Sequence, residues 1–137
     1  RTWLGRAVQV QVEIPAWSRL KTHADGSLDF VAPLPCPWDY GHIPGETGGD
    51  GDPLDALLLT PRTALGQRQE SAVQGVALFM DGGLQDDKLI CAPDLPSRAT
   101  RLAVGAFLLG YGVAKRLRHW RLGRSGATGL QTLVWRR

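Results

Sequence analysis

The length and composition of the chain are those of an ordinary globular domain and exclude several classes of protein. Of 137 residues, 43% are hydrophobic and 21% charged, so we expect residues 1–137 to form a single domain. No apolar run approaches the ~20 residues that a membrane-spanning helix needs, and no basic, apolar leader is seen, so we expect a cytoplasmic protein. Cys36 and Cys91 are too few for a disulfide framework and are expected to be buried free thiols.

The net charge of +3 conceals an uneven distribution along the chain. All 13 acidic residues lie at or before Asp94, where only seven Lys and Arg residues occur, so this part carries a charge of −6. From Leu95 onward there are nine basic residues and no acidic ones. This division indicates that the part up to Asp94 attracts cations and that the part from Leu95 onward faces anions. A solvated basic surface explains most of the nine basic residues equally well.

The first half of the chain contains short strands and a long loop. Alternation over residues 7–14 predicts a strand with four aliphatic side chains on one face and Glu13 on the other, ended by Pro15. Residues 24–27 predict a hairpin turn into a returning strand at 28–31. Residues 33–53 are rich in proline and glycine and predict an ordered functional loop.

The second half of the chain adds further strands and one helix. The predicted strands cover residues 54–60, 71–80, 88–92 and 130–135. Apolar spacing predicts a helix over 101–109, ended by Gly110 and Gly112. Many short strands with one late helix favour a mainly β (α+β) fold, a small barrel with one or two peripheral helices.

Carboxylates crowd together near an apolar run. Asp50, Asp52 and Asp55 precede Leu57-Leu58-Leu59, and Asp81 and Asp86 follow about thirty residues later. Such groups repel one another, and a buried unpaired charge is costly, so a cation is expected among them. In an extended loop Asp50 and Asp52 face the same side. Hard divalent cations such as Mg²⁺ prefer oxygen ligands, which indicates metal-assisted phosphate chemistry.

A calcium-binding EF-hand is the main alternative for the Asp-x-Asp pattern. The twelfth position of that loop carries a bidentate Glu, but counting from Asp50 it is Pro61 here. Pro53 and the apolar strand also replace the later ligands. The EF-hand interpretation is therefore rejected.

Several further segments extend the acidic pattern into a longer, ordered series. They are Val12-Glu13-Ile14-Pro15, Lys21, Pro37-Trp38-Asp39-Tyr40-Gly41, Asp50-Gly51-Asp52-Pro53-Leu54-Asp55, Gly75-Val76, Asp81, Asp86-Asp87-Lys88 and Tyr111. In this order the series resembles the family I soluble inorganic pyrophosphatases. The resemblance implies an OB-like five-stranded barrel, Mg²⁺-dependent hydrolysis of pyrophosphate to two phosphates, and a homo-oligomer.

The resemblance also implies a role for each matching side chain. Several Mg²⁺ ions are held in one active site, and Asp52 is the general base for the attacking water. The implied metal ligands are Asp50, Asp55, Asp81 and Asp86, with Glu13 acting directly or through water. The implied phosphate-binding residues are Lys21, Tyr40, Lys88 and Tyr111. Two metals that share a water lower its pKa and stabilise both the attacking and the leaving oxygen.

Four positions depart from the family pattern. His23 stands where the family has Glu, and Cys36 replaces a Tyr. No Arg occurs near Phe30, and Gly112 replaces a phosphate-binding Lys. The C-terminal helix of the family is expected to be shortened or missing. Basic residues close to Tyr111 in sequence could substitute for the lost cation, namely Lys115, Arg116, Arg118 and Arg121. We therefore expect metal binding to be better preserved than fast turnover.

Two other functions remain open at this point. A divergent member of the family could prefer another phosphoanhydride or hydrolyse very little. A non-catalytic barrel could instead bind RNA or polyphosphate, because Trp120 lies among several basic residues. A core Trp120 with solvated arginines explains that pattern equally well. Nucleic acid and membranes are therefore not the expected partners.

Overall fold

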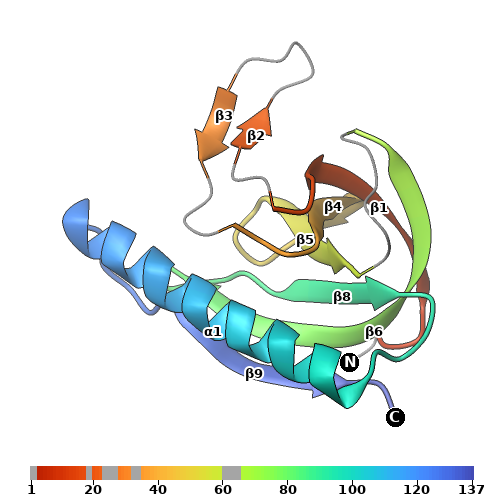
Figure 1. Cartoon of the computed structure of the whole chain (residues 1–137). Helices are drawn as coiled ribbons and strands as arrows, with labels where there is room; N and C mark the ends of the chain where they lie inside the picture. The colour runs from red at the N-terminus through yellow and green to blue at the C-terminus, as the bar shows by residue number, and fades with distance from the viewer. Residues whose placement is uncertain (1–2, 18–19, 23–27, 32–34, 60–65) are drawn as a thin grey trace.

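The chain folds mainly into strands, with one long helix towards its C-terminal end (Figure 1). The computed structural model describes residues 3–17, 20–22, 28–31, 35–59 and 66–137. The strands are β1 (Ala7–Ile14), β2 (Leu20–Thr22), β3 (Leu28–Val31), β4 (Asp39–Thr47), β5 (Pro53–Leu58), β6 (Arg68–Asp81), β7 (Leu84–Gln85), β8 (Lys88–Ala92) and β9 (Gly129–Trp135), and the helix is α1 (Arg98–Arg121).

Five of these strands close into a barrel, as the sequence predicted. They are hydrogen-bonded in the order β1-β4-β5-β8-β6, and β6 pairs with β1 to complete the circle. β5 and β8 run parallel, whereas the other neighbours are antiparallel. The predicted alternation of β1 is confirmed, because Val8, Val10, Val12 and Ile14 are all buried. Val8, Val10 and Val12 pack against aliphatic residues of β5, β6 and β8 inside the barrel.

A second hydrophobic layer attaches α1 to the outside of the barrel. Val104 and Leu108 of α1 are fully buried against Leu57, Ala77 and Ile90. Burying such a side chain contributes about 1.5–3 kcal/mol. Residues of β9 join the same cluster, since β9 pairs with the second half of β6. The helix is thereby held across the barrel, where its second half can reach the end of β6 (Figure 1).

Helix α1 is much longer than the predicted 101–109, and the expected stop at Gly110 and Gly112 is wrong. Glycine inside a helix costs about 1 kcal/mol relative to alanine, but tertiary packing can outweigh this cost. At Gly112 a Cβ atom would lie 2.9 Å from the Cα of Gly129 in β9. The missing side chain therefore lets the helix approach β9 closely, and glycine serves packing rather than termination.

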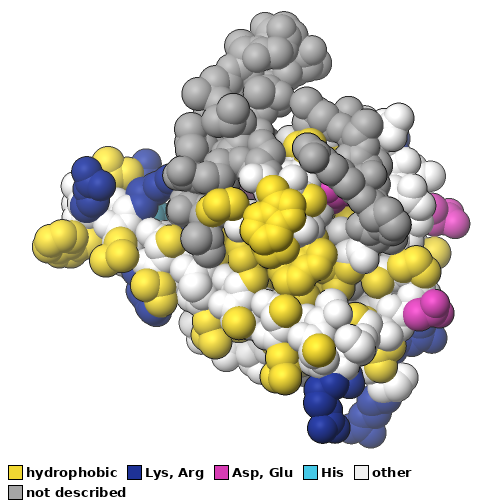
Figure 2. Space-filling model, in the orientation of Figure 1, with side chains coloured by type: hydrophobic (Ala, Val, Ile, Leu, Met, Phe, Trp, Pro, Cys, Tyr) yellow, Lys and Arg dark blue, Asp and Glu magenta, His cyan; other side chains and the backbone are white. Residues whose placement is uncertain are grey.

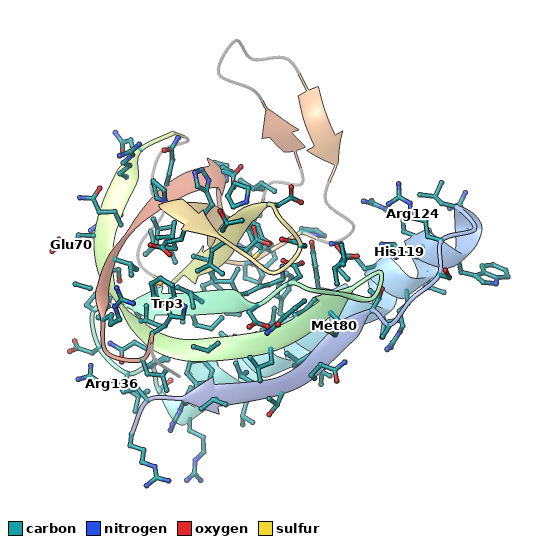
Figure 3. The ribbon with its side chains drawn as sticks, turned by 180° about the vertical axis from the view of Figure 1, so that it is seen from behind. Trp3, Glu70, Met80, His119, Arg124 and Arg136 are labelled. Carbon is teal, nitrogen blue, oxygen red and sulfur yellow. The ribbon has the colours of Figure 1, made fainter. Side chains whose placement is uncertain are left out.

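The helix ends instead at Leu122, beyond the predicted range. Gly123 adopts a left-handed φ of +69° and its N–H donates to the carbonyl of Trp120. The N–H of Arg124 donates to the carbonyl of His119 at 2.8 Å, and together these bonds form a Schellman motif. Figure 3 shows His119 and Arg124 together at this end of α1. No helix follows β9 among the described residues.

The predicted loop over residues 33–53 is also partly wrong, because β4 occupies Asp39–Thr47. Its buried positions alternate as a strand requires, but they are filled by Asp39, Gly41 and Ile43, only one of which is aliphatic. The hydrophobic alternation that identifies strands was therefore hidden. The strand at 28–31 is confirmed and pairs with β2, whereas the predicted turn at 24–27 lies outside the described residues.

Two smaller expectations can be compared with the structure. Cys36 and Cys91 are free and buried, as predicted, and burial raises the pKa of each thiol to about 12. Trp120, in contrast, is 79% exposed, so of the two alternatives for this residue the one that places it in the core is wrong. Within the described ranges, no helix has the length and apolar character needed to cross a bilayer.

Candidate active site

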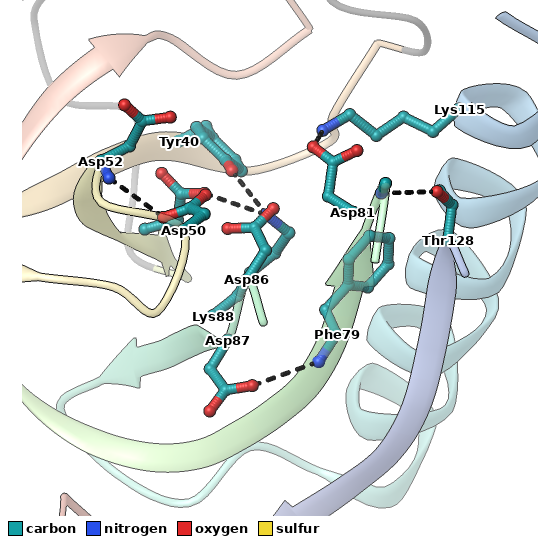
Figure 4. Close-up of polar contacts among 12 residues, drawn as sticks. Tyr40, Asp50, Asp52, Phe79, Asp81, Asp86, Asp87, Lys88, Lys115 and Thr128 are labelled. Carbon is teal, nitrogen blue, oxygen red and sulfur yellow. Dashed lines mark hydrogen bonds and ion pairs between the residues drawn. The ribbon is translucent and has the colours of Figure 1, made fainter. Parts of the chain in front are cut away.

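A cavity of about 360 Å³ lies where the strand ends of the barrel meet α1. Its walls combine six carboxylates with two tyrosines, a proline and a lysine. Figure 4 shows part of this set, namely Tyr40, Asp50, Asp52, Asp81, Asp86 and Lys115. The lining residues are Glu13, Tyr40, Asp50, Asp52, Pro53, Asp55, Asp81, Asp86, Tyr111 and Lys115. Every carboxylate that the sequence nominated for the site is thus gathered around one space.

Glu13 reaches the cavity from an irregularity in β1. Val12 pairs with Gly41 and Ile14 with Tyr40, so Glu13 is the extra residue of a β-bulge. A bulge redirects the side chain of its extra residue and is frequent beside active sites. Glu13 Oε1 lies 3.0 Å from His42 Nδ1 of the neighbouring strand. The bulge therefore presents a carboxylate to the cavity from the face opposite the barrel core.

Asp50 and Asp52 enter the cavity from a tight turn between β4 and β5. The N–H of Gly48 donates to the carbonyl of Asp52 at 2.8 Å, and the N–H of Asp52 donates to Asp50 Oδ1 at 3.1 Å. The expected extended loop is therefore wrong, since the chain turns back on itself here. The turn nevertheless brings both carboxylates to the same cavity, as the spacing predicted.

At the base of the cavity a buried lysine, Lys88, contacts Tyr40, Asp55 and Asp86. We call these four residues the floor of the cavity. Lys88 Nζ donates to Tyr40 Oη at 3.0 Å, to Asp55 Oδ2 at 3.0 Å and to Asp86 Oδ2 at 3.1 Å. Its side chain is only 1% exposed. All three donors of the ammonium group are therefore used within the protein.

One ammonium cannot neutralise two carboxylates, and the pKa values of the floor reflect this. Burial opposes ionisation of Asp55, but the charge and hydrogen bond of Lys88 outweigh it and lower the pKa of Asp55. Burial, together with the nearby Asp55, raises the pKa of Asp86 to about 7 despite Lys88. Negative charge is thus in excess in this part of the cavity, which favours a bound cation.

The opposite side of the cavity, which we call the α1 rim, consists of Asp81, Lys115, His119 and Thr128. Lys115 Nζ pairs with Asp81 Oδ2, and His119 Nε2 lies 3.1 Å from Asp81 Oδ1. Behind them, the N–H of Gly82 donates to Thr128 Oγ1 at 2.9 Å, and that hydroxyl lies 3.5 Å from His119 Nδ1. Both oxygens of Asp81 are therefore engaged by residues one helical turn apart on α1.

Only some of the predicted phosphate-binding residues line the cavity. Tyr40 and Tyr111 line the cavity, whereas Lys88 lies beneath the carboxylates and the side chain of Lys21 lies outside the described residues. Lys115 lines the cavity, although the resemblance assigned no role to it. Its position four residues after Tyr111 places both on one helix face, a signal that requires α1 to continue past Gly112.

In the described part of the chain, no three carboxylate, histidine or cysteine side chains form a group that could hold a metal ion as they stand. Lys88 contacts the oxygens of Asp55 and Asp86, and Lys115 contacts Asp81. The donor atoms around the cavity are nonetheless carboxylate oxygens, the ligands that Mg²⁺ prefers.

Comparison with known proteins places this arrangement in a family. The family model described as inorganic pyrophosphatase matches residues 10–103, more than half of the chain. The chain belongs to the inorganic pyrophosphatase family. An inorganic pyrophosphatase from Neisseria meningitidis is 41% identical over 97 residues, covering 65% of this chain and 55% of that protein. One from Gluconobacter oxydans is 37% identical over 94 residues, covering 63% of this chain and 54% of that protein.

Solved inorganic pyrophosphatases share the fold over nearly the whole chain. The enzyme from Neisseria gonorrhoeae superposes with a TM-score of 0.73 at 28% identity, covering 96% of this chain and 83% of that one. The Thermus thermophilus enzyme gives a TM-score of 0.74 at 26% identity, covering 95% and 83%. In sequence, however, the chain spans about half the length of the curated inorganic pyrophosphatases it matches.

The family match does not cover the cavity evenly. It includes all six lining carboxylates but ends at residue 103, within the first turns of α1. The six lining carboxylates therefore lie within the matched range, whereas Tyr111 and Lys115 of the same cavity lie outside it.

Proposed function

We propose that the chain hydrolyses inorganic pyrophosphate to two phosphates in a Mg²⁺-dependent reaction. The observation that carries this proposal is the convergence of six carboxylates on one cavity in the fold of the inorganic pyrophosphatase family. Transfer of a phosphoryl group to water needs positioning and charge neutralisation more than covalent catalysis. A cavity of carboxylates, tyrosines and lysine provides both when divalent cations are present.

The residues that would hold Mg²⁺ are oxygen donors, as this ion requires. We assign Asp50, Asp55, Asp81 and Asp86 to this role, with Glu13 acting directly or through water. The geometry of the floor supports the assignment, because Asp55 and Asp86 share a single lysine, and two neighbouring carboxylates favour a further cation. Bound Mg²⁺ supplies Lewis acidity and makes a coordinated water more acidic.

The remaining side chains position the substrate and move its protons. Asp52 is the general base, and its exposed carboxylate on the tight turn faces the cavity. Burial raises the pKa of Tyr40 well above its usual value, so its hydroxyl keeps its proton. Tyr40 Oη accepts from Lys88 and its O–H is hydrogen-bonded to Asp55, so binding of a phosphate oxygen requires the hydroxyl to turn away from that carboxylate. Lys21 and Tyr111 keep their predicted phosphate-binding roles within this proposal. For Lys88, whose three donors are all used within the protein, we propose instead that it holds Tyr40, Asp55 and Asp86 in place.

The decisive experiment measures phosphate release from pyrophosphate with Mg²⁺, with EDTA, and in the Asp52→Asn variant. We expect Mg²⁺-dependent release that falls at least ~10²-fold in the variant, because the carboxylate can no longer accept a proton. Absence of release from folded wild-type protein would overturn the proposal. Release from another phosphoanhydride alone would identify a divergent specificity, and salt-sensitive RNA binding without release would identify a polyanion-binding module.

We further propose that the chain forms a homo-oligomer through the outer face of α1. Large hydrophobic side chains are exposed along this helix at spacings that place them on one side, and Figure 2 shows them along its surface. They are Leu102, Leu109, Val113, Leu117 and Trp120. A contiguous apolar stripe favours a protein partner over water. Light scattering should report an oligomer that Val113→Lys dissociates, and a monomeric wild type would contradict the proposal.

The cytoplasmic location predicted from the sequence remains part of this proposal. Two buried free thiols support it, because reduced cysteines are typical of reducing compartments. Fractionation of cells that express the chain would test the location.

A further inference from the structure

We propose that Lys115 binds a phosphoryl oxygen of the substrate, and that it is freed to do so when a divalent cation replaces it on Asp81. This inference rests on the proposed function and assigns a residue of this chain that lies beyond the family match. It makes the α1 rim the anion-binding side of the cavity, opposite the carboxylates of the turn and the floor.

The first argument is the position of Lys115. Among the described side chains that line the cavity, it is the one cationic group. Its side chain is 16% exposed, whereas that of Lys88 is 1% exposed and has all three donors occupied. A polyanion entering a space lined by six carboxylates needs positive charge that it can contact directly. Of the two lysines, Lys115 is the one that such a ligand can reach.

The second argument is how Lys115 is held. Its Nζ lies 5.5 Å from the centroid of the Tyr111 ring, another lining residue, so the ring helps to keep the ammonium group at the cavity. Lys115 and Tyr111 are four residues apart on α1, and the buried Val104 and Leu108 fix that helix to the barrel. The ammonium group therefore has a second contact at the cavity, from the helix side, besides its ion pair with Asp81.

The third argument concerns Asp81, whose two oxygens have different partners. Oδ1 faces His119 Nε2 at 3.1 Å, and His119 is supported by Thr128. Oδ2 faces Lys115. A cation that takes Oδ2 would displace Lys115 while His119 continues to orient the carboxylate. The displaced ammonium group, which is partly open to the cavity, would then lack its counter-ion, which favours a charge-assisted hydrogen bond to an anionic oxygen of the ligand.

This exchange links the binding of the cation to the binding of the anion. If cation binding at Asp81 makes Lys115 available, then each ligand must raise the affinity for the other by the same factor. Substitution of Lys115 should therefore change the two affinities in opposite directions. A lysine that only anchors α1 to the barrel would not do so, because losing an anchor would weaken both sites together.

The test is calorimetric titration of Mg²⁺ alone, and of imidodiphosphate at saturating Mg²⁺, into wild-type, Lys115→Met and Lys115→Arg proteins. Lys115→Met should bind imidodiphosphate about tenfold more weakly, because a charge-assisted hydrogen bond is lost. It should bind Mg²⁺ alone several-fold more tightly, because a competitor for Asp81 is gone. Lys115→Arg should retain most of the analogue affinity. Arg98→Met removes an exposed charge at the opposite end of the same helix and should change neither affinity.

A second variant tests whether release from Asp81 makes Lys115 available to the analogue, without a substitution of Lys115 itself. Asp81→Asn removes the partner of Lys115, so in the absence of metal it should bind imidodiphosphate several-fold more tightly than wild type does. Unchanged analogue affinity in Lys115→Met, or weaker binding of both ligands, would overturn the inference. If Lys115→Met does not fold, unchanged or lower metal-free affinity in Asp81→Asn would overturn it instead.

The outcomes separate this inference from the proposed function. Wild-type protein that releases no phosphate, but loses analogue affinity in Lys115→Met, would leave the binding role standing and overturn the hydrolysis. Wild-type protein that hydrolyses pyrophosphate, together with unchanged imidodiphosphate affinity in Lys115→Met, would leave the hydrolysis standing and overturn the binding role of Lys115. A wild-type protein that binds no imidodiphosphate at saturating Mg²⁺ would overturn both.

Discussion

The floor of the cavity and its α1 rim each place one lysine against acidic side chains, but they do so in different surroundings. On the floor, Lys88 is enclosed and donates to a tyrosine and two carboxylates. On the rim, Lys115 is partly open to the cavity and pairs with Asp81, whose second oxygen has another partner. The lysine–aspartate pairs of the floor are thus a fixed part of the fold, whereas the lysine–aspartate pair of the α1 rim can exchange its partners.

The comparison shows that burial, rather than pairing, decides what an ion pair does here. A buried pair that loses one partner leaves a charge that water cannot solvate, whereas a partly exposed pair is replaced by water, ions or ligand. Lys88 follows Asp86 in the sequence, and Lys115 faces Asp81. Both aspartates were nominated for the site from the sequence. The different exposure of the two lysines comes from their elements, since Lys88 starts a strand between two neighbours and Lys115 projects from a helix at the edge of the cavity.

The largest expected effect comes from removing the floor lysine. Lys88→Met should lower the free energy of unfolding by about 3–5 kcal/mol, because Asp55 and Asp86 would be left without their counter-ion. Lys115→Met on the rim should cost no more than ~1 kcal/mol, as is usual for a solvent-accessible pair. Urea denaturation of the metal-free proteins measures both values. Equal losses at the two lysines would contradict the distinction between floor and rim.

An intermediate effect is expected where α1 meets β9. Gly112→Ala places a Cβ atom 2.9 Å from the backbone of Gly129, so the helix must shift, at a cost of about 1–3 kcal/mol. The shift should also displace Tyr111 and Lys115 and reduce turnover. Gly105→Ala is the matched control, because its Cβ would make an ordinary 3.8 Å contact with Leu133. There, higher helix propensity should stabilise the protein by up to about 1 kcal/mol. Thermal unfolding compares the two variants, and a stabilised Gly112→Ala would show that the close approach is not needed.

The smallest effect is expected behind the rim, at Thr128. Thr128→Val removes the hydroxyl that accepts from the N–H of Gly82 and contacts His119. We expect a loss of about 1 kcal/mol, because one partly buried donor loses its acceptor. Thr128→Ser keeps the hydroxyl and should retain most of the stability. Chemical denaturation compares the two variants. A loss in Thr128→Ser with none in Thr128→Val would assign the effect to packing of the methyl group.

The barrel and its acidic cluster could be predicted from the sequence because both depend on local patterns. Alternation revealed β1, and the spacing of Asp50, Asp52 and Asp55 remained informative even though the turn that carries them is not extended. The bulge that directs Glu13 could not be predicted, since it depends on the register between β1 and β4. Strand β4 was hidden because Asp39 and Gly41 fill buried positions where aliphatic residues are expected.

The α1 rim could not be predicted because it depends on contacts between distant segments. Glycine within a helical pattern normally indicates a terminus, and only the approach of β9 explains why Gly112 continues the helix instead. Without that extension, Lys115 and His119 have no defined position relative to Asp81. Sequence proximity to Tyr111 could nominate four basic residues, but the choice of Lys115 required the helix phase and the position of β6.

Strand β6 also has a consequence for the order in which the protein assembles. Its first residues pair with β1 near the start of the described chain, its middle pairs with β8, and its last residues pair with β9 near the end. Strands β1 and β9 are far from it in sequence, and folding is slow when pairing is predominantly non-local. Asp81 pairs locally with Leu84 of β7, but the residues before it, 75–80, become fixed only after β9 has docked. The acidic turn can thus form early, whereas a complete cavity should be among the final events of folding.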